Sequence, residues 1–401
     1  MWNVTVKSGF FENYIINDQS YCNIAIHFLP IFDLPNLTEL LLYRIGITLI
    51  PGVGDVNGKK LISYCGSPEA VFREKRKALM KIPGIGEATV NSILSQKVLE
   101  RAEKEIAFIE KYNIQPLYYT DKEYPVRLKH CVDSPIMLYY KGNADLNVER
   151  VVGIVGTRRA TEYGKESCKK IVEGLADTDA LIISGLAYGI DTCSHKAALD
   201  NNLKTVGVVA HGLDRIYPSD NKSLAKRMQN GGGIITEFLS ETNPDRENFP
   251  QRNRIIAGMV DALVVVESAK RGGALITADI ANSYNRDVFA VPGDINKKFS
   301  EGCNLFIKTN RAALIQSADD IKYIMRWETE SKKPPKQRKL FIELKDDEQV
   351  IVDILKDMEQ AGIDFLVANS GLTPSKVASA LLNLEFEGIV KSLPGKIYKM
   401  G

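Results

Sequence analysis

The stretch Val151-Val152-Gly153-Ile154-Val155-Gly156-Thr157-Arg158-Arg159 decides the fold of this chain. A short run of Val and Ile is typical of a strand covered on both faces of a parallel sheet. The run breaks into a glycine turn where backbone amides approach an anion, Thr157 adds a hydroxyl donor and Arg158 adds a bidentate phosphate contact. The spacing G-x-G-x-x-G is absent, so no dinucleotide fingerprint is predicted. Alone, the turn equally fits a strand-to-helix connection with exposed arginines.

Further apolar runs follow, and helical stretches lie between them. Such alternation predicts a doubly wound α/β domain with a parallel sheet. Ligands of such sheets bind beyond the carboxyl ends of the strands, where the glycine turns of this chain fall. The other predicted strands are Ala180–Ile183, Thr205–Ala210, Gly233–Ile235, Ala262–Glu267 and Asp287–Val291, and the helices are Gly164–Leu175, Asp191–Asn201 and Leu224–Asn230.

A second stretch, Phe249-Pro250-Gln251-Arg252-Asn253-Arg254-Ile255-Ile256-Ala257-Gly258, gathers arginine and amide forks beside an aromatic ring. Arginine forks bind phosphate, and a ring offers a nucleobase a face for stacking. We expect at least two of Arg246, Arg252 and Arg254 to contact a ligand. An arginine of this group that does not contact a ligand would instead be structural and tie the loop to Glu237 or Asp261.

Three more glycine-bearing turns follow predicted strands, at Ser184–Asp191, Glu267–Ala278 and Val291–Gly293, and a further turn lies at His211–Pro218. With their basic residues and a phenylalanine in reach, these turns predict an extended anion groove. Such a groove suits several successive phosphates with stacked bases between them, more than a single mononucleotide.

Asp191 and His195 stand four residues apart on a predicted helix. An aspartate that caps this helix, with a helical histidine behind it, explains the pair. The alternative is an acid–base pair, which with Glu237 would make the protein a nucleotide-binding or nucleotide-processing enzyme. No nucleophile stands out, so we predict no catalytic residues.

The composition limits the classes of protein that fit. The chain has 401 residues, enough for two or three domains, and 52 basic against 50 acidic residues, so any nucleic-acid site must be a local patch. The six cysteines form no C-x-x-C pair and the four histidines show no H-E-x-x-H spacing, which predicts neither a disulfide frame nor a metal site. With no apolar run near ~18 residues and no signal peptide, we expect a soluble, cytoplasmic protein without membrane insertion or cofactor.

The ends of the chain predict separate modules. Residues 1–35 are expected to be a loosely ordered leader, and residues 36–113 a helical domain. Ile50-Pro51-Gly52-Val53-Gly54 and Ile82-Pro83-Gly84-Ile85-Gly86 each place a Gly-x-Gly turn before a helix. The pair resembles the helix–hairpin–helix motif, whose turn amides point at a DNA phosphate, although two tight turns in a helical bundle would look alike.

Residues 114–327 then form the α/β domain, residues 328–345 a charged, proline-bearing linker, and residues 346–401 a winged helix. The second helix of this module, about Thr373 to Glu387, carries only Lys376 as a basic residue. DNA-reading helices usually carry more Arg, Lys, Asn or Gln. We therefore favour a protein-contact or tethering role over that of a duplex-specific regulator.

Taken in order, G-T-R-R-A-T-x-Y-G, S-G-L-A-Y-G-I-D, Tyr217-Pro218, F-P-x-R-N-R-I-I-A-G, G-G-A-L-I-T-A and V-P-G resemble the DNA-processing protein A (DprA, or Smf) family over residues 114 to 325. The terminal modules, one helix–hairpin–helix (SAM-like) and one winged-helix, are similar to those of longer members. The resemblance implies an extended Rossmann-like domain that binds single-stranded DNA and forms a homodimer. It also implies loading of RecA recombinase onto DNA during natural transformation, displacement of single-strand binding protein, and no established catalytic activity.

The resemblance also carries over residues of the binding site. The family's Gly-Thr-Arg loop falls on residues 156–158, and its basic and aromatic groups fall on Arg246 and Phe249; position 246 holds lysine in some relatives. Phosphates would bind the arginines and a base would stack on Phe249, whereas duplex DNA should bind worse and a dimer should gain from avidity. The predicted DNA-binding residues are Gly156, Thr157, Arg158, Arg159, Ser184, Gly185, Arg246, Phe249, Arg252, Asn253, Arg254, Gly272 and Gly273.

Overall fold

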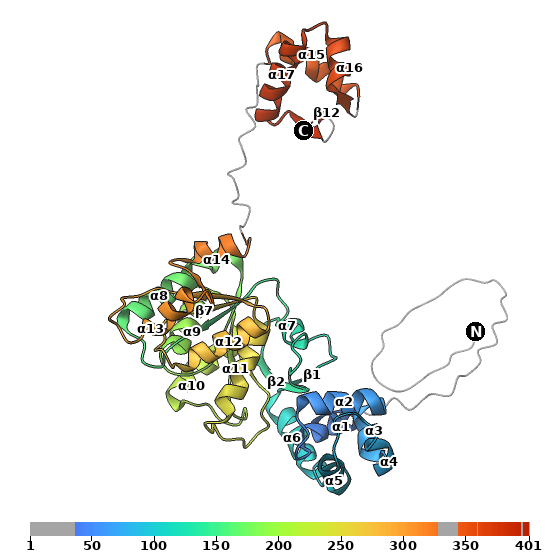
Figure 1. Ribbon diagram of the computed structural model, residues 1–401, viewed down its shortest axis with the longest axis vertical. Helices are drawn as coiled ribbons and strands as arrows, with labels where there is room; N and C mark the ends of the chain where they lie inside the picture. The colour runs from blue at the N-terminus through green and yellow to red at the C-terminus, as the bar shows by residue number, and fades with distance from the viewer. Residues whose placement is uncertain (1–36, 328–343, 359, 394–395, 401) are drawn as a thin grey trace, which may run out of the picture. The chain divides into compact units, whose positions relative to one another are not determined.

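The computed structural model describes residues 37–327, 344–358, 360–393 and 396–400 (Figure 1). They belong to two compact units that divide between residues 328 and 329. The predicted leader and nearly all of the predicted linker lie outside the described residues. Within the described part, no helix is long and apolar enough to cross a bilayer.

The first unit is built on a nine-stranded sheet in the order β1-β2-β6-β5-β4-β3-β7-β8-β9. Strands β3 to β9 run parallel to one another, as predicted, while β2 pairs antiparallel with both β1 and β6. This antiparallel edge was not predicted. The strands are β1 Gln115–Tyr118, β2 Met137–Gly142, β3 Val151–Val155, β4 Leu181–Ser184, β5 Thr205–Val208, β6 Gly232–Thr236, β7 Ala262–Val265, β8 Asp287–Ala290 and β9 Ala313–Leu314.

Helices cover both faces of this sheet (Figure 1). Alternate residues of β3 show the two layers, because Val151 and Val155 pack with α11 and α12, whereas Val152 and Ile154 pack with α8 and α9. All of these strand side chains are buried, which explains the unbroken apolar run. The helices are α7 Val126–Lys129, α8 Glu162–Gly174, α9 Ile190–Asp200, α10 Lys222–Asn230, α11 Asn248–Met259, α12 Gly273–Ser283, α13 Glu301–Lys308 and α14 Ala318–Ile324.

The strand order reverses beside β3, which lies between β4 on one side and β7 on the other. The loops after β3 and β7 therefore leave the same edge of the sheet in opposite directions and open a crevice between them. Such a switch point is where open α/β sheets bind their ligands.

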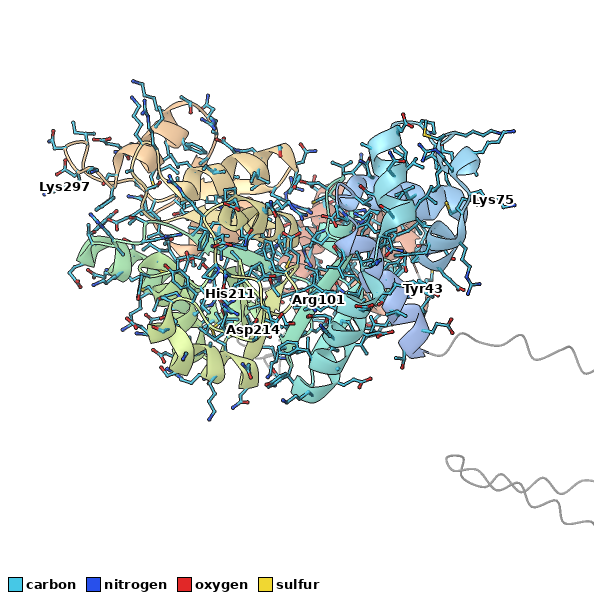
Figure 2. The ribbon with its side chains drawn as sticks, turned by 90° about the horizontal axis from the view of Figure 1, so that it is seen from below. Tyr43, Lys75, Arg101, His211, Asp214 and Lys297 are labelled. Carbon is cyan, nitrogen blue, oxygen red and sulfur yellow. The ribbon has the colours of Figure 1, made fainter. Side chains whose placement is uncertain are left out.

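The helical module of residues 37–112 packs against the antiparallel edge of the sheet. Tyr118, Met137 and Tyr139 of that edge belong to the same apolar cluster as the helices. Arg101 also donates to the carbonyl of Ser240 at 2.6 Å, which places it beside the loop of Asp214 (Figure 2). The helices are α1 Leu37–Leu49, α2 Asp55–Cys65, α3 Pro68–Arg73, α4 Arg76–Leu79, α5 Glu87–Ser95 and α6 Leu99–Tyr112.

The second unit has the three helices and the small sheet expected of a winged helix. Its core is one apolar cluster that includes Ile351, Leu366, Leu381 and Val390. The three-stranded sheet has the order β10-β12-β11. The elements are α15 Asp346–Lys356, β10 Ala361–Gly362, α16 Ile363–Ser370, α17 Pro374–Phe386, β11 Val390–Leu393 and β12 Ile397–Met400.

Candidate nucleic-acid interface

A groove of about 690 Å³ opens at the switch point, beyond the carboxyl ends of β3 and β7. Its walls come from the loops after β3, β4, β5 and β7, from the start of α12, and from α11 with the loop before it. Segments that are more than a hundred residues apart in the sequence, around Arg158 and Thr277, thus line one surface. The predicted groove is present at the predicted edge of the sheet.

Backbone hydrogen bonds to neighbouring segments fix the loop after β3. The amide of Thr157 donates to the carbonyl of Glu267 at 2.8 Å, and the carbonyl of Thr157 accepts from the amide of Ile190 at 3.2 Å. A Cβ atom at Gly156 would lie 2.4 Å from the side chain of Ile190, so only glycine fits there. The Thr157 amide is therefore not available to an anion, whereas Arg158 is pushed outward and is exposed.

Phe249 forms the aromatic centre of the groove. Its half-buried ring lies 4.9 Å from the guanidinium carbon of Arg158 and 6.4 Å from the ring of Tyr217. Neither Arg158 nor Arg159 nor Arg246 has an ion pair with any residue that the structure describes. Uncompensated guanidinium groups beside a partly exposed ring are the groups that bind phosphate and stack a base.

Arg252 lies at the floor of the groove and not on its rim. It is 6% exposed, and its Nη1 donates to the carbonyl of Val208 at 2.5 Å. Burial raises the pKa of the neighbouring Asp191 carboxyl, while the positive charge of Arg252 acts in the opposite direction. Because its main partners are inside the protein, we assign Arg252 to supporting the groove and correct the expectation that it is a principal phosphate ligand.

His195 also lies below the groove. Its ring nitrogens contact the hydroxyl of Thr205 at 2.7 Å and the carbonyl of Gly185 at 2.6 Å. Complete burial lowers the pKa of the imidazole to about 4, so the ring is neutral near pH 7. With both nitrogens occupied and no exposed surface, His195 has no geometry for acid–base work on a ligand.

Arg254 points away from the groove. Its guanidinium forms ion pairs with Glu237 and with Asp55, the latter at 3.1 Å, and its side chain is 15% exposed. It also donates to the carbonyl of Asp133. Arg254 does not line the groove, and its ion pair with Glu237 matches the predicted alternative that one of these arginines ties the loop to Glu237.

The start of α12 supplies a different kind of anion contact. The helix begins at Gly273 without a side-chain cap, and Gly272 and Gly273 both line the groove. The first amides of a helix have no intrahelical acceptor and bind anions well. A Cβ atom at Gly272 would lie 2.2 Å from the hydroxyl of Ser268, whereas Gly273 faces open space.

The structure thus brings most of the predicted residues together. Ser184 and Gly185 are exceptions, because Ser184 is fully buried with its hydroxyl donating to Ile154, and Gly185 packs against Asp191 and Arg252. Tyr217, which belongs to the predicted groove turn His211–Pro218, also lines the groove, although it is absent from the predicted DNA-binding residues. The predicted residues that line the groove are Gly156, Thr157, Arg158, Arg159, Arg246, Phe249, Arg252, Asn253, Gly272 and Gly273.

The terminal modules are less suited to binding DNA. Both helices that follow the Gly-x-Gly turns begin with an acid, Asp55 or Glu87, and a carboxylate there opposes a phosphate. Asp55 is moreover engaged by the Ile136 amide and by Arg254. In the winged helix, Lys376 pairs with Asp347 at 3.1 Å.

These features define an α/β protein with a basic, aromatic groove at the switch point of its sheet. In the sequence, the helical module precedes the α/β part and the winged helix follows it. Family models match its parts in the same order. The model for DNA recombination-mediator protein A matches residues 115–326, the DprA winged helix domain matches 332–396, and a SAM-like helix-hairpin-helix tandem matches 46–96.

Comparison with individual proteins agrees. A Synechocystis protein named Smf is 32% identical over 393 residues, covering 89% of this chain and 98% of that protein. DNA processing protein DprA of Streptococcus pneumoniae is 41% identical over 201 residues, covering 50% of this chain and 71% of that protein. The X-ray structure of the latter superposes with a TM-score of 0.58 at 33% identity, covering 70% of this chain and 97% of that one. The chain belongs to the DNA-processing protein A (DprA/Smf) family, which confirms the resemblance and the predicted fold class.

Proposed function

We propose that this protein captures single-stranded DNA in the strand-end groove without sequence preference. One observation carries the proposal, namely the Phe249 ring in contact with the unpaired guanidinium of Arg158 inside the groove. Arg158 and Arg246 take phosphates, and the amides at the start of α12 take another. Stacking of a base on Phe249 contributes about 1–3 kcal/mol. Duplex DNA binds worse, because paired bases hide their faces.

The wider role in the proposal is to protect incoming DNA and to load RecA recombinase onto it during natural transformation. In this role the protein displaces single-strand binding protein, and it acts as a homodimer whose two grooves bind one strand together. Membership of the DNA-processing protein A family supports these statements. A cytoplasmic location belongs to the same proposal, since scattered cysteines suit a reducing compartment. The groove binds DNA without a catalytic step, because His195 is enclosed.

Fluorescence anisotropy tests the groove directly. Wild type and the double variant Arg158→Ala/Phe249→Ala are titrated with a single-stranded oligonucleotide of about ten bases, the matching duplex and a mononucleotide. A matched control, Lys308→Ala/Tyr323→Ala, removes one exposed cation and one exposed ring that do not line the groove. We expect wild type to prefer the single strand over the duplex. The Arg158→Ala/Phe249→Ala variant should lose binding, and the control variant should bind like wild type. Tighter mononucleotide binding, or equal binding by both variants, would overturn the proposal.

The wider role has its own test. Light scattering at several protein concentrations measures the homodimer. Assembly of RecA filaments on a strand coated with single-strand binding protein measures loading. We expect the Arg158→Ala/Phe249→Ala variant to remain dimeric and to fail in loading. Normal loading by a variant that no longer binds DNA would reject the link between the groove and RecA.

A further inference from the structure

Two cysteines on neighbouring helices meet beside the groove-bearing sheet. Cys168 lies in α8 and is fully buried, whereas Cys193 lies in the first turns of α9 and is partly exposed. The thiol of Cys193 contacts the carbonyl of Lys165 at 3.5 Å. Cys193 also packs against the apolar cluster that contains Cys168. The two cysteines therefore lie where α8 and α9 pack together.

The two thiols are not equivalent. Interaction with Cys168, together with the nearby cations of Lys165, Lys196 and Lys169, lowers the pKa of the Cys193 thiol to about 7 against the effect of burial. Interaction with Cys193, together with burial, raises the pKa of the Cys168 thiol. Near neutral pH, Cys193 is thus the more accessible and more readily ionised thiol, whereas Cys168 stays protonated.

We propose that Cys193 and Cys168 form a peroxide-reactive dithiol that closes into a reversible disulfide between α9 and α8. Among the other described cysteines, burial raises the pKa of Cys65, Cys131 and Cys303, and the pKa of none of them is shifted by a second cysteine. The chemistry is that of an accessible thiolate with a resolving thiol beside it.

The reaction uses a hydroperoxide as oxidant. The Cys193 thiolate attacks one peroxide oxygen, so that an S–O bond forms, the O–O bond breaks, and the leaving oxygen takes up a proton as water or an alcohol. The thiol of Cys168 then attacks the resulting sulfenic acid. An S–S bond forms, the S–O bond breaks, and the hydroxide leaves with the thiol proton as water. Each sulfur gives up one electron, and the peroxide oxygens accept both.

Reactivity of the unmodified protein gives the first test. At pH 7, a thiol with the pKa of Cys193 holds about fifty times more thiolate than one at pKa 9, but it is intrinsically less nucleophilic. We expect iodoacetamide to alkylate Cys193 about five- to tenfold faster than Cys65. The pH midpoint for Cys193 should lie near 7 and that for Cys65 above 9.0. Equal rates or equal midpoints would overturn the assignment.

Oxidation gives the second test. The full chain is treated with hydrogen peroxide, denatured without reductant, alkylated and mapped by mass spectrometry. A cross-linked peptide containing Cys168 and Cys193, cleaved by dithiothreitol, supports the proposal. Cys168→Ser should stop at a sulfenic acid on Cys193 that dimedone traps, Cys193→Ser should leave Cys168 unoxidised, and Cys65→Ser should match wild type. A wild-type Cys193 that joins another cysteine, or none, would reject the disulfide.

Discussion

The two sides of helix α11 use the same residue type for opposite purposes. On the groove side, Arg158 lies against Phe249 and Arg246 lines the same groove, and no described carboxylate forms an ion pair with either guanidinium group. On the other side, Arg254 meets Glu237 and Asp55 where the sheet joins the helical module. The pairing of an arginine, more than its place in a motif, thus separates the arginines that we propose to bind a ligand from one that supports the structure.

The side of Arg254 carries the largest predicted effect. Arg254→Ala leaves Glu237 and Asp55 without their partner, and loss of one member of a largely buried ion pair costs about 3–5 kcal/mol. We expect urea unfolding, followed by circular dichroism, to show a loss of that size. Single-stranded DNA affinity of the folded protein should stay unchanged.

The matched control is Arg246→Ala, which removes an exposed arginine from the other side. Its free energy of unfolding should stay within about 0.5 kcal/mol of wild type. If Arg254→Ala instead weakened DNA binding and left stability intact, the comparison between the two sides would be wrong.

The floor of the groove sharpens the comparison through pH. The pKa of His195 falls from 6.5 to about 4 on folding, so between these values the unfolded chain binds more protons. Acidification therefore favours unfolding, and the stability present above pH 6.5 declines by about 3 kcal/mol as pH approaches 4.

Urea unfolding over a pH series measures this decline, with His195→Asn as the comparison. The variant should lose the part of the pH slope due to the imidazole, whatever its absolute stability. A wild-type slope that survives the substitution would show that His195 is not the titrating group.

The sequence predicted the sheet where its pattern was strong and missed it where the pattern was weak. The predicted strand Val151–Val155 matches β3 because a strand buried on both faces needs an unbroken apolar run. In contrast, β1 is short, lies at the edge and contains Pro116, a residue that signals a turn or an edge strand. Its pairing with β2 depends on tertiary contacts with the helical module, which no local pattern records.

The candidate site shows the same limit. The order of the motifs located the groove, since strand-end turns of parallel strands meet at one edge. A structural tie to Glu237 was predicted, but the sequence could not show that Arg254 makes it. Arg252 and Arg254 stand two residues apart on α11 and so point in different directions. Their partners at the Val208 carbonyl and at Asp55 come from distant segments. The role of the Thr157 amide could not be predicted either, because it donates to the carbonyl of Glu267, which is distant in the sequence.

On the groove side, we expect Phe249 to carry the largest single contribution to binding of single-stranded DNA. Phe249→Ala should weaken single-stranded DNA binding by about 1–3 kcal/mol at constant salt, because a stacked base is lost. Phe249→Tyr keeps a ring and should retain most of the affinity. Anisotropy titrations compare the two variants. If alanine and tyrosine behaved alike, the ring would not be a stacking platform.

The smallest predicted effect concerns salt. If Arg246 contacts one phosphate, Arg246→Ala should flatten the log–log dependence of single-strand affinity on salt by about 0.7, since one fewer counterion is released. Its exposed, unpaired side chain makes this change separable from stability. Phe249→Ala, which removes no charge, should lower affinity and keep the wild-type slope. If Phe249→Ala changed the salt slope and Arg246→Ala did not, the assignment of a phosphate contact to Arg246 and of base stacking to Phe249 would be wrong.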